Sequence, residues 1–157
     1  MTDLRSAPAP GLRPDDHVRG DGTLVVVYAD FTCPRCAVAH ARLRERPVRR
    51  VFRHLALKSK HPRAVAVAHA AEAAAGQGAF WDFHDALYAD QGRQEDPHLW
   101  ALAERLGLDV ARFEADRRSA AVAERVEAQT REALRAGAMT TPTLIVGGRI
   151  VDLDSVS

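Results

Sequence analysis

Two cysteines separated by two residues carry the clearest chemical signal in this sequence. The segment Cys33-Pro34-Arg35-Cys36 holds both cysteines of the chain, and it follows an apolar run over 23–29 after a short turn. Pro34 suits the first position of a helix, because its fixed φ fits the helix and its missing N–H would be unpaired there. Cys33 is therefore expected at a helix N-terminus, where free N–H groups and the helix dipole lower a thiol pKa from about 8.5 to roughly 3.5–7.5. Cys36 follows closely enough to resolve a mixed disulfide.

A zinc site is the main alternative use of two cysteines at this spacing. Zinc takes four ligands, and the sequence has neither a second C-x-x-C nor a pair of histidines at the usual interval. His61 and His69 are too scattered to complete such a site. The pattern favours a redox dithiol that needs no metal or other cofactor, while a non-catalytic relic of such a pair stays open.

The elements that must position the cysteines begin as a β-α-β unit. Residues 23–29 are almost continuously apolar, which is typical of a strand covered on both faces. The helix that starts at Pro34 must stop before Pro47, and residues 48–57 predict a second strand. Such a unit is normally parallel and right-handed.

Helices and then a hairpin complete the predicted order. Residues 62–137 read as helices throughout, and Gly147-Gly148 is a two-residue turn between strands at 143–146 and 149–151. We expect a flexible leader over 1–20 and one α/β domain over 21–157. Its core is expected to comprise 21–61 and 138–157, with a helical insertion over 62–137.

Composition excludes several classes of protein. The 157 residues are 46% hydrophobic and 27% charged, which suits a folded globular domain, and a net charge of +1 gives no general attraction to nucleic acid or anionic membrane. No apolar run reaches the length of about 18 residues that a membrane span needs, so no membrane insertion is expected. The polar first residues lack the apolar core of a signal peptide, so the sequence predicts a cytoplasmic location.

Two motifs together resemble a known family. The segment Phe31-Thr32-Cys33-Pro34-Arg35-Cys36, the helical block, and Thr140-Thr141-Pro142-Thr143 ahead of the hairpin resemble DsbA-like thioredoxin-fold oxidoreductases. The sequence is most similar to the short bacterial type, including the thioredoxin-like domain fused to sodium/proton antiporters. The resemblance covers about residues 15–151.

The resemblance implies a role for each matching residue. Cys33 would be the exposed nucleophile and Cys36 the resolving thiol, and together they would exchange disulfides with protein or low-molecular-weight thiols. The expected substrate-binding residues are Pro34, Arg35, Thr141 and Pro142. Pro142 would follow a cis peptide bond, which frees the Thr141 backbone to pair with an extended substrate segment.

Two departures from the family pattern lead to further expectations. Val27 stands where many relatives have a buried acid, so proton transfer to Cys36 would use water or another group such as Asp30. The sequence also ends six residues after Val151, which leaves no room for the family's last covering helix. We therefore expect a truncated form, or an uncovered sheet face that a second copy covers in a homodimer.

Three further readings concern function and site. The domain could instead be a redox-sensing interaction module that acts on a transporter or another partner. A kappa-type glutathione transferase is disfavoured, because such proteins resemble this one but usually have serine at the position of Cys33. His40, one turn after Cys36, is expected on the solvated face of its helix.

Overall fold

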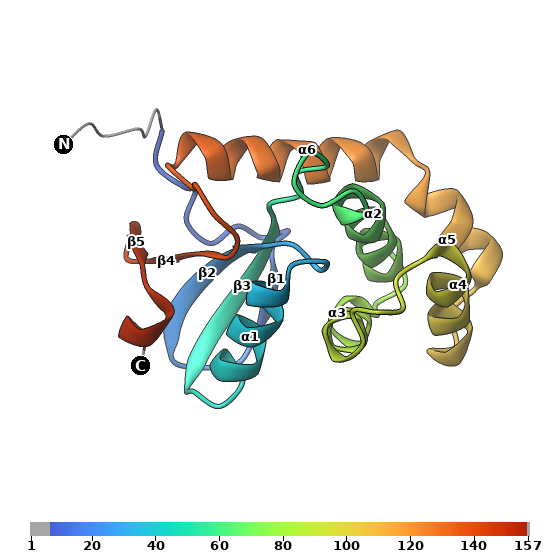
Figure 1. The fold of residues 1–157 in the computed structure, drawn as a ribbon, viewed down its shortest axis with the longest axis horizontal. Coiled ribbons are helices and arrows are strands. Elements are labelled where there is room, and N and C mark those ends of the chain that lie inside the picture. The colour runs from blue at the N-terminus through green and yellow to red at the C-terminus, as the bar shows by residue number, and fades with distance from the viewer. Residues whose placement is uncertain (1–6, 157) are drawn as a thin grey trace.

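A five-stranded mixed sheet organises residues 7–156, which are the residues that the computed structural model describes (Figure 1). The spatial order is β1-β3-β2-β4-β5. The strands are β1 (His17–Arg19), β2 (Thr23–Ala29), β3 (Val48–His54), β4 (Thr143–Val146) and β5 (Arg149–Val151). Strand β2 pairs in parallel with β3 and antiparallel with β4, so the strand that leads to the cysteines lies at the centre of the sheet.

Six α-helices connect and cover the strands. Helix α1 (Pro34–Leu43) links β2 to β3, and five helices separate β3 from β4 in the sequence: α2 (Ala64–Ala75), α3 (Phe80–Ala89), α4 (Asp96–Arg105), α5 (Val110–Arg117) and α6 (Ala120–Arg135). Figure 1 shows α2–α5 grouped beside the sheet, while α6 runs along the top of the view over both parts. The predicted α/β fold, a β-α-β unit and a hairpin with a helical insertion, is confirmed.

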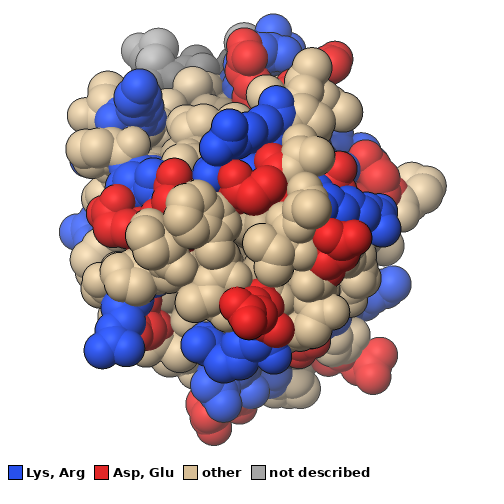
Figure 2. All heavy atoms as spheres, turned by 90° about the vertical axis from the view of Figure 1, so that its right-hand side faces the viewer, with Lys and Arg blue, Asp and Glu red and all other residues tan. Residues whose placement is uncertain are grey.

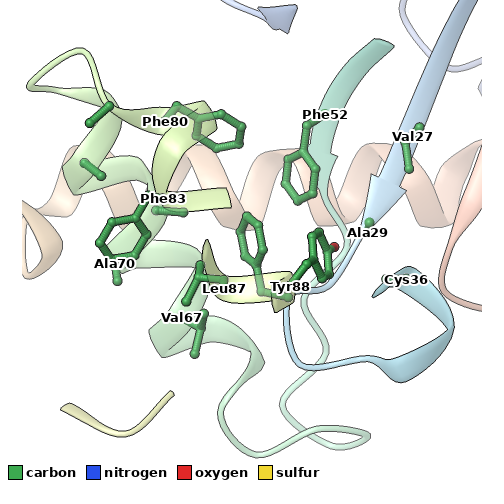
Figure 3. Close-up of a cluster of buried hydrophobic side chains, with 14 of the residues drawn as sticks. Val27, Ala29, Cys36, Phe52, Val67, Ala70, Phe80, Phe83, Leu87 and Tyr88 are labelled. Atoms are coloured by element: carbon green, nitrogen blue, oxygen red, sulfur yellow. The ribbon is translucent and has the colours of Figure 1, made fainter. Parts of the chain in front are cut away.

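Alternating side chains of β2 pack on opposite faces of the sheet, as the period of a strand requires. Val25, Val27 and Ala29 belong to the large apolar cluster that includes residues of α1, α2 and α3 (Figure 3). Val26 and Tyr28 belong to a second cluster on the other face, which includes Ala133 of α6. Helices on both faces explain why this strand is apolar throughout.

The segment before β2 is not a loose leader where the structure describes it. Residues 17–19 form β1, which pairs antiparallel with β3. The side chain of Arg53 is fully buried and donates hydrogen bonds to the carbonyl oxygens of Pro10 and Gly11, both at 2.6 Å. It also binds both carboxylate oxygens of Asp16, at 2.9 and 2.8 Å. The flexible leader predicted over 1–20 is therefore wrong for residues 10–20, and residues 1–6 lie outside the described part.

The segment after the hairpin packs onto the sheet. Leu153–Ser155 form a short 3-10 turn, and Val156 is 5% exposed within the same apolar cluster as Val25 and Leu144. Arg46 fixes this segment by donating to the carbonyl oxygens of Leu153 and Val156, at 2.5 and 2.7 Å. The last residues thus cover part of the face that was expected to be open, and a homodimer through that face stays a prediction.

The outer surface is mixed in charge where Figure 2 views it, on the side of the helical block. Basic and acidic side chains alternate over this face. Among the helices in residues 7–156, none is long and apolar enough to cross a membrane.

Candidate functional site

The junction between β2 and α1 places the two cysteines as the sequence predicts. Cys33 is the N-cap of α1, with an extended backbone (φ −86°, ψ 122°), and Pro34 occupies the first turn. Both cysteines are free thiols, and Cys36 belongs to the apolar cluster that includes Ala29 (Figure 3). Cys33 is only 4% exposed, so the expectation of an exposed nucleophile is wrong. The neighbouring Pro34 and Arg35 are the exposed residues of the motif.

The loop before β4 covers Cys33. The Thr141–Pro142 peptide bond is cis, as predicted. The Thr141 hydroxyl donates a hydrogen bond to Cys33 Sγ at 3.2 Å, and the Thr141 carbonyl oxygen lies 3.7 Å from the same sulfur. Strand β4 pairs with β2 up to Thr143, and this pairing brings the loop to the end of β2 where the cysteines begin. The structure therefore unites Cys33, Cys36 and Thr141, which are far apart in the sequence.

The two thiols have opposite acidities. The pKa of Cys33 is lowered to about 5, first because the Cys36 thiol donates a hydrogen bond to its sulfur. The Thr141 hydroxyl and the N–H groups of Arg35 and Cys36 act in the same direction, against burial. The pKa of Cys36 is raised well above its usual value for two reasons. Deprotonation would break the hydrogen bond that the Cys36 thiol donates to Cys33, and it would leave a negative charge in a buried position. At neutral pH, Cys33 is a thiolate and Cys36 a thiol.

Three polar side chains from the helical block hold the turn that carries Cys33. Gln91 donates to the carbonyl oxygens of Phe31 and Cys33, at 3.0 and 2.9 Å, and Gln94 donates to that of Phe31 at 2.9 Å. The Tyr88 hydroxyl donates to the carbonyl oxygen of Asp30 at 3.2 Å. Sequence analysis missed these residues, because their role depends on tertiary contacts and leaves no periodic pattern.

A buried acid lies beside the dithiol although the family's position for it holds Val27. Asp30 is 2% exposed, and its backbone N–H donates to Cys36 Sγ at 3.5 Å. Burial raises the pKa of its carboxyl group, and its Oδ2 atom has no hydrogen-bond partner among the described residues. Val27 packs in the same apolar cluster as Cys36. Asp30 is thus the acid that the structure offers for proton transfer near Cys36.

The prediction that His40 lies on a solvated helix face is wrong. Its side chain is 11% exposed and packs against His84 and Tyr88 of α3. His40, His84 and Asp85 place their ligand atoms within 4.8 Å of one another, a spacing that could hold a metal ion. However, Arg50 already donates to His40 Nδ1 at 2.9 Å, and a second guanidinium binds both oxygens of Asp85. A metal ion is therefore disfavoured at this position, because two guanidinium groups already bind the side chains that would ligate it.

Comparisons with known proteins agree with this geometry. The sequence model described as thioredoxin matches residues 14–156. The chain is 46% identical over 146 residues to an antiporter of Salinispora tropica, named Na(+)/H(+) antiporter NhaA 3; the match covers 85% of this chain and 22% of that protein. The chain thus spans about a quarter or less of the curated relatives it matches most strongly.

Two solved structures are similar to this chain over most of its length. A thioredoxin-like oxidoreductase from Silicibacter pomeroyi superposes with a TM-score of 0.78 and 26% identity, covering 88% of this chain and 84% of that one. DsbA2 of Pseudomonas aeruginosa has a TM-score of 0.68 and 28% identity, covering 90% and 87%.

Proposed function

The chain belongs to the thioredoxin family, and on that premise we propose that it is a thiol–disulfide oxidoreductase whose reactive groups are Cys33 and Cys36. The observation that carries the proposal is the opposite acidity of the two thiols at the start of α1. A thiolate is the attacking species in disulfide exchange. A nearby protonated thiol can then resolve the mixed disulfide once it loses its proton. The two similar solved structures, a thioredoxin-like oxidoreductase and a DsbA protein, support the same reaction class.

The reaction begins with attack by the Cys33 thiolate on one sulfur of a substrate disulfide. The Cys33–substrate S–S bond forms, the substrate disulfide breaks, and the other substrate sulfur leaves as a thiolate that takes up a proton. Cys36 then loses its proton and attacks Cys33 Sγ, which releases the second substrate thiolate and leaves a Cys33–Cys36 disulfide. Two electrons pass from the dithiol to the substrate, and the reverse sequence oxidises a substrate dithiol.

Deprotonation of Cys36 is the demanding step, because burial and the loss of its hydrogen bond both oppose it. Once Cys33 is in a mixed disulfide, it carries no negative charge, and one cause of the raised Cys36 pKa disappears. The Asp30 carboxylate is buried beside Cys36, and one of its oxygens accepts no hydrogen bond from residues 7–156, so we assign it the role of proton acceptor.

Substrate contact is assigned to residues at the rim of Cys33. Pro34 and Arg35 are exposed, and the Thr141 carbonyl oxygen stands 3.7 Å from Cys33 Sγ. The Thr141 and Pro142 backbone offers an extended partner for a substrate segment, in the manner of strand addition. We propose protein or low-molecular-weight disulfides as substrates, with the direction set by the reduction potential of the pair.

Two measurements test the proposal. The ultraviolet absorbance of the thiolate, followed against pH in the reduced protein, should titrate near pH 5 and should vanish in Cys33→Ser. Insulin-disulfide reduction should require Cys33, while Cys36→Ser should trap a mixed disulfide. A Cys33 that titrates near 8.5 together with no turnover in either direction would reject the proposed function.

The antiporter relatives favour a second candidate, a redox-sensing domain that acts on a transporter. In that role, the oxidation state of the pair would change affinity for a partner rather than turn over substrate. Pull-down with the oxidised and reduced protein distinguishes the two, because identical partners in both states would argue against sensing.

A further inference from the structure

A groove behind the dithiol is lined by an excess of positive charge. It lies between α1, α3 and the β1–β3 side of the sheet and has a volume of about 710 Å³. Its ionisable lining comprises Arg19, Arg44, Arg46, Arg50, His40, Asp85 and Tyr88. Four guanidinium groups thus face one carboxylate. The volume is within the range of about 300–1,000 Å³ that is usual for small-molecule sites.

Arg50 is the most buried of these cations. It is 7% exposed, and its side chain has one hydrogen bond among the described residues, to His40 Nδ1 at 2.9 Å. No carboxylate within residues 7–156 lies within ion-pair distance of it. Burial, followed by the charge of Arg19, lowers its pKa to about 10, which still leaves it charged at neutral pH. A buried cation without a counter-charge is costly, so this position favours an anion from outside the chain.

The neighbours of Arg50 cannot supply that counter-charge. His40 is a neutral group, since burial and the nearby His84 and Arg50 lower its pKa to about 4. Asp85 is already occupied, because its two oxygens accept from Arg19 at 2.7 and 3.1 Å and one also pairs with His84 at 2.8 Å. The remaining donors of Arg50 are thus available to a ligand.

We propose that this groove binds a small organic anion that carries carboxylate or phosphate groups, with Arg50 as the central contact and Arg44 at the exposed rim. The planar guanidinium matches both kinds of anion in bidentate geometry. The apolar part of the wall, which includes Ala37, Ala86 and Ala89, would contact the carbon skeleton of the ligand.

The groove is distinct from the substrate face at Cys33 and Thr141, neither of which lines it. A cavity of about 20 Å³ is lined by Cys36, and it shares His40, Leu43, Arg50 and Tyr88 with the groove. An anion bound at Arg50 would therefore lie behind the resolving thiol. This site stands independently of the proposed oxidoreductase activity.

Titration of the reduced chain with inorganic phosphate and, separately, with citrate tests the site by nuclear magnetic resonance at constant ionic strength. We expect saturable shifts at the amides of Ala37 and Ala89 and at Arg50 Nε, and the tighter anion identifies the preferred group. Arg50→Gln should weaken binding by about ten-fold or more, as the loss of a charge-assisted hydrogen bond implies.

Two further variants keep the test decisive if Arg50→Gln folds poorly. Arg44→Gln changes an exposed side chain and should weaken binding about three-fold. Arg118→Gln is the matched control, because that side chain is 71% exposed and lies away from the groove, and it should leave binding unchanged. Shifts that stay linear with anion concentration, or an affinity that neither groove variant alters, would overturn the proposal.

Discussion

The hydrogen bond from Thr141 to Cys33 Sγ gives the sharpest quantitative prediction. Thr141→Val keeps the shape of the side chain and removes the hydroxyl that lies 3.2 Å from the sulfur. A hydrogen bond to a charged group contributes about 1.5–3 kcal/mol, and one pKa unit corresponds to about 1.36 kcal/mol. The Cys33 pKa should therefore rise from about 5 by roughly one to two units.

The same substitution should make the pair a stronger reductant. A stabilised thiolate stabilises the reduced form, so losing one of its donors destabilises that form relative to the disulfide. About 1.4 kcal/mol corresponds to about 30 mV for this two-electron couple, so the reduction potential should fall by roughly 30–60 mV.

Thiolate absorbance against pH measures the first effect, and equilibration with a glutathione buffer measures the second. Thr140→Val is the matched control, because Thr140 is an exposed neighbour whose hydroxyl has no hydrogen bond in the described part of the chain. If Thr141→Val leaves the Cys33 pKa within about 0.3 units of the wild type, the Thr141 hydroxyl does not stabilise the thiolate.

Three other predictions concern stability. The pKa of Cys33 is depressed to about 5 in the folded state, so the thiolate stabilises the fold fully above about pH 8.5. This contribution to the free energy of unfolding is lost as the pH falls towards 5. Urea unfolding of the reduced protein at several pH values should show this loss relative to Cys33→Ser. Arg53→Met leaves the buried carboxylate of Asp16 without its main partner and should cost about 3–5 kcal/mol in the free energy of unfolding, and a loss below about 1 kcal/mol would contradict the buried pair. Gly22→Ala should cost about 2 kcal/mol or more, because Gly22 has φ +117° and a Cβ there would lie 2.0 Å from the Pro47 carbonyl oxygen; an unchanged melting temperature would refute that strain.

The central elements could be predicted because local signals and tertiary context agree for them. The strand over 23–29 and the hairpin strands over 143–146 and 149–151 have the predicted bounds, since apolar runs and a Gly-Gly turn mark them. The second strand ends at His54 rather than residue 57, where its pairing with β2 stops. The helix start at Pro34 is also confirmed.

The errors fall where a long-range partner decides the outcome. Strand β1 has three residues, and it forms because β3 offers it an edge. The sequence pattern of β3 does not indicate that the Arg53 side chain is fully buried. Its burial depends on the segment around Asp16, which lies 37 residues earlier in the sequence. His40 would lie on a solvated face if α3 did not pack against α1 there. Gln91 and Gln94 look like ordinary loop residues until the turn at Phe31 is placed beside them.

The acidity of Cys33 has a consequence for the life of the chain before it is folded. The donors that produce it come from the start of α1 and from Thr141, 108 residues away in sequence, while the turn is held by the loop after α3. A chain still emerging from the ribosome, in which α1 has not formed, carries two ordinary thiols with a pKa of about 8.5, and a chain with α1 but without β4 still lacks the Thr141 donor. Cys33 therefore becomes fully reactive only when the fold is complete. In chains that have not yet folded, the protonated thiols are less susceptible to oxidation than a thiolate would be.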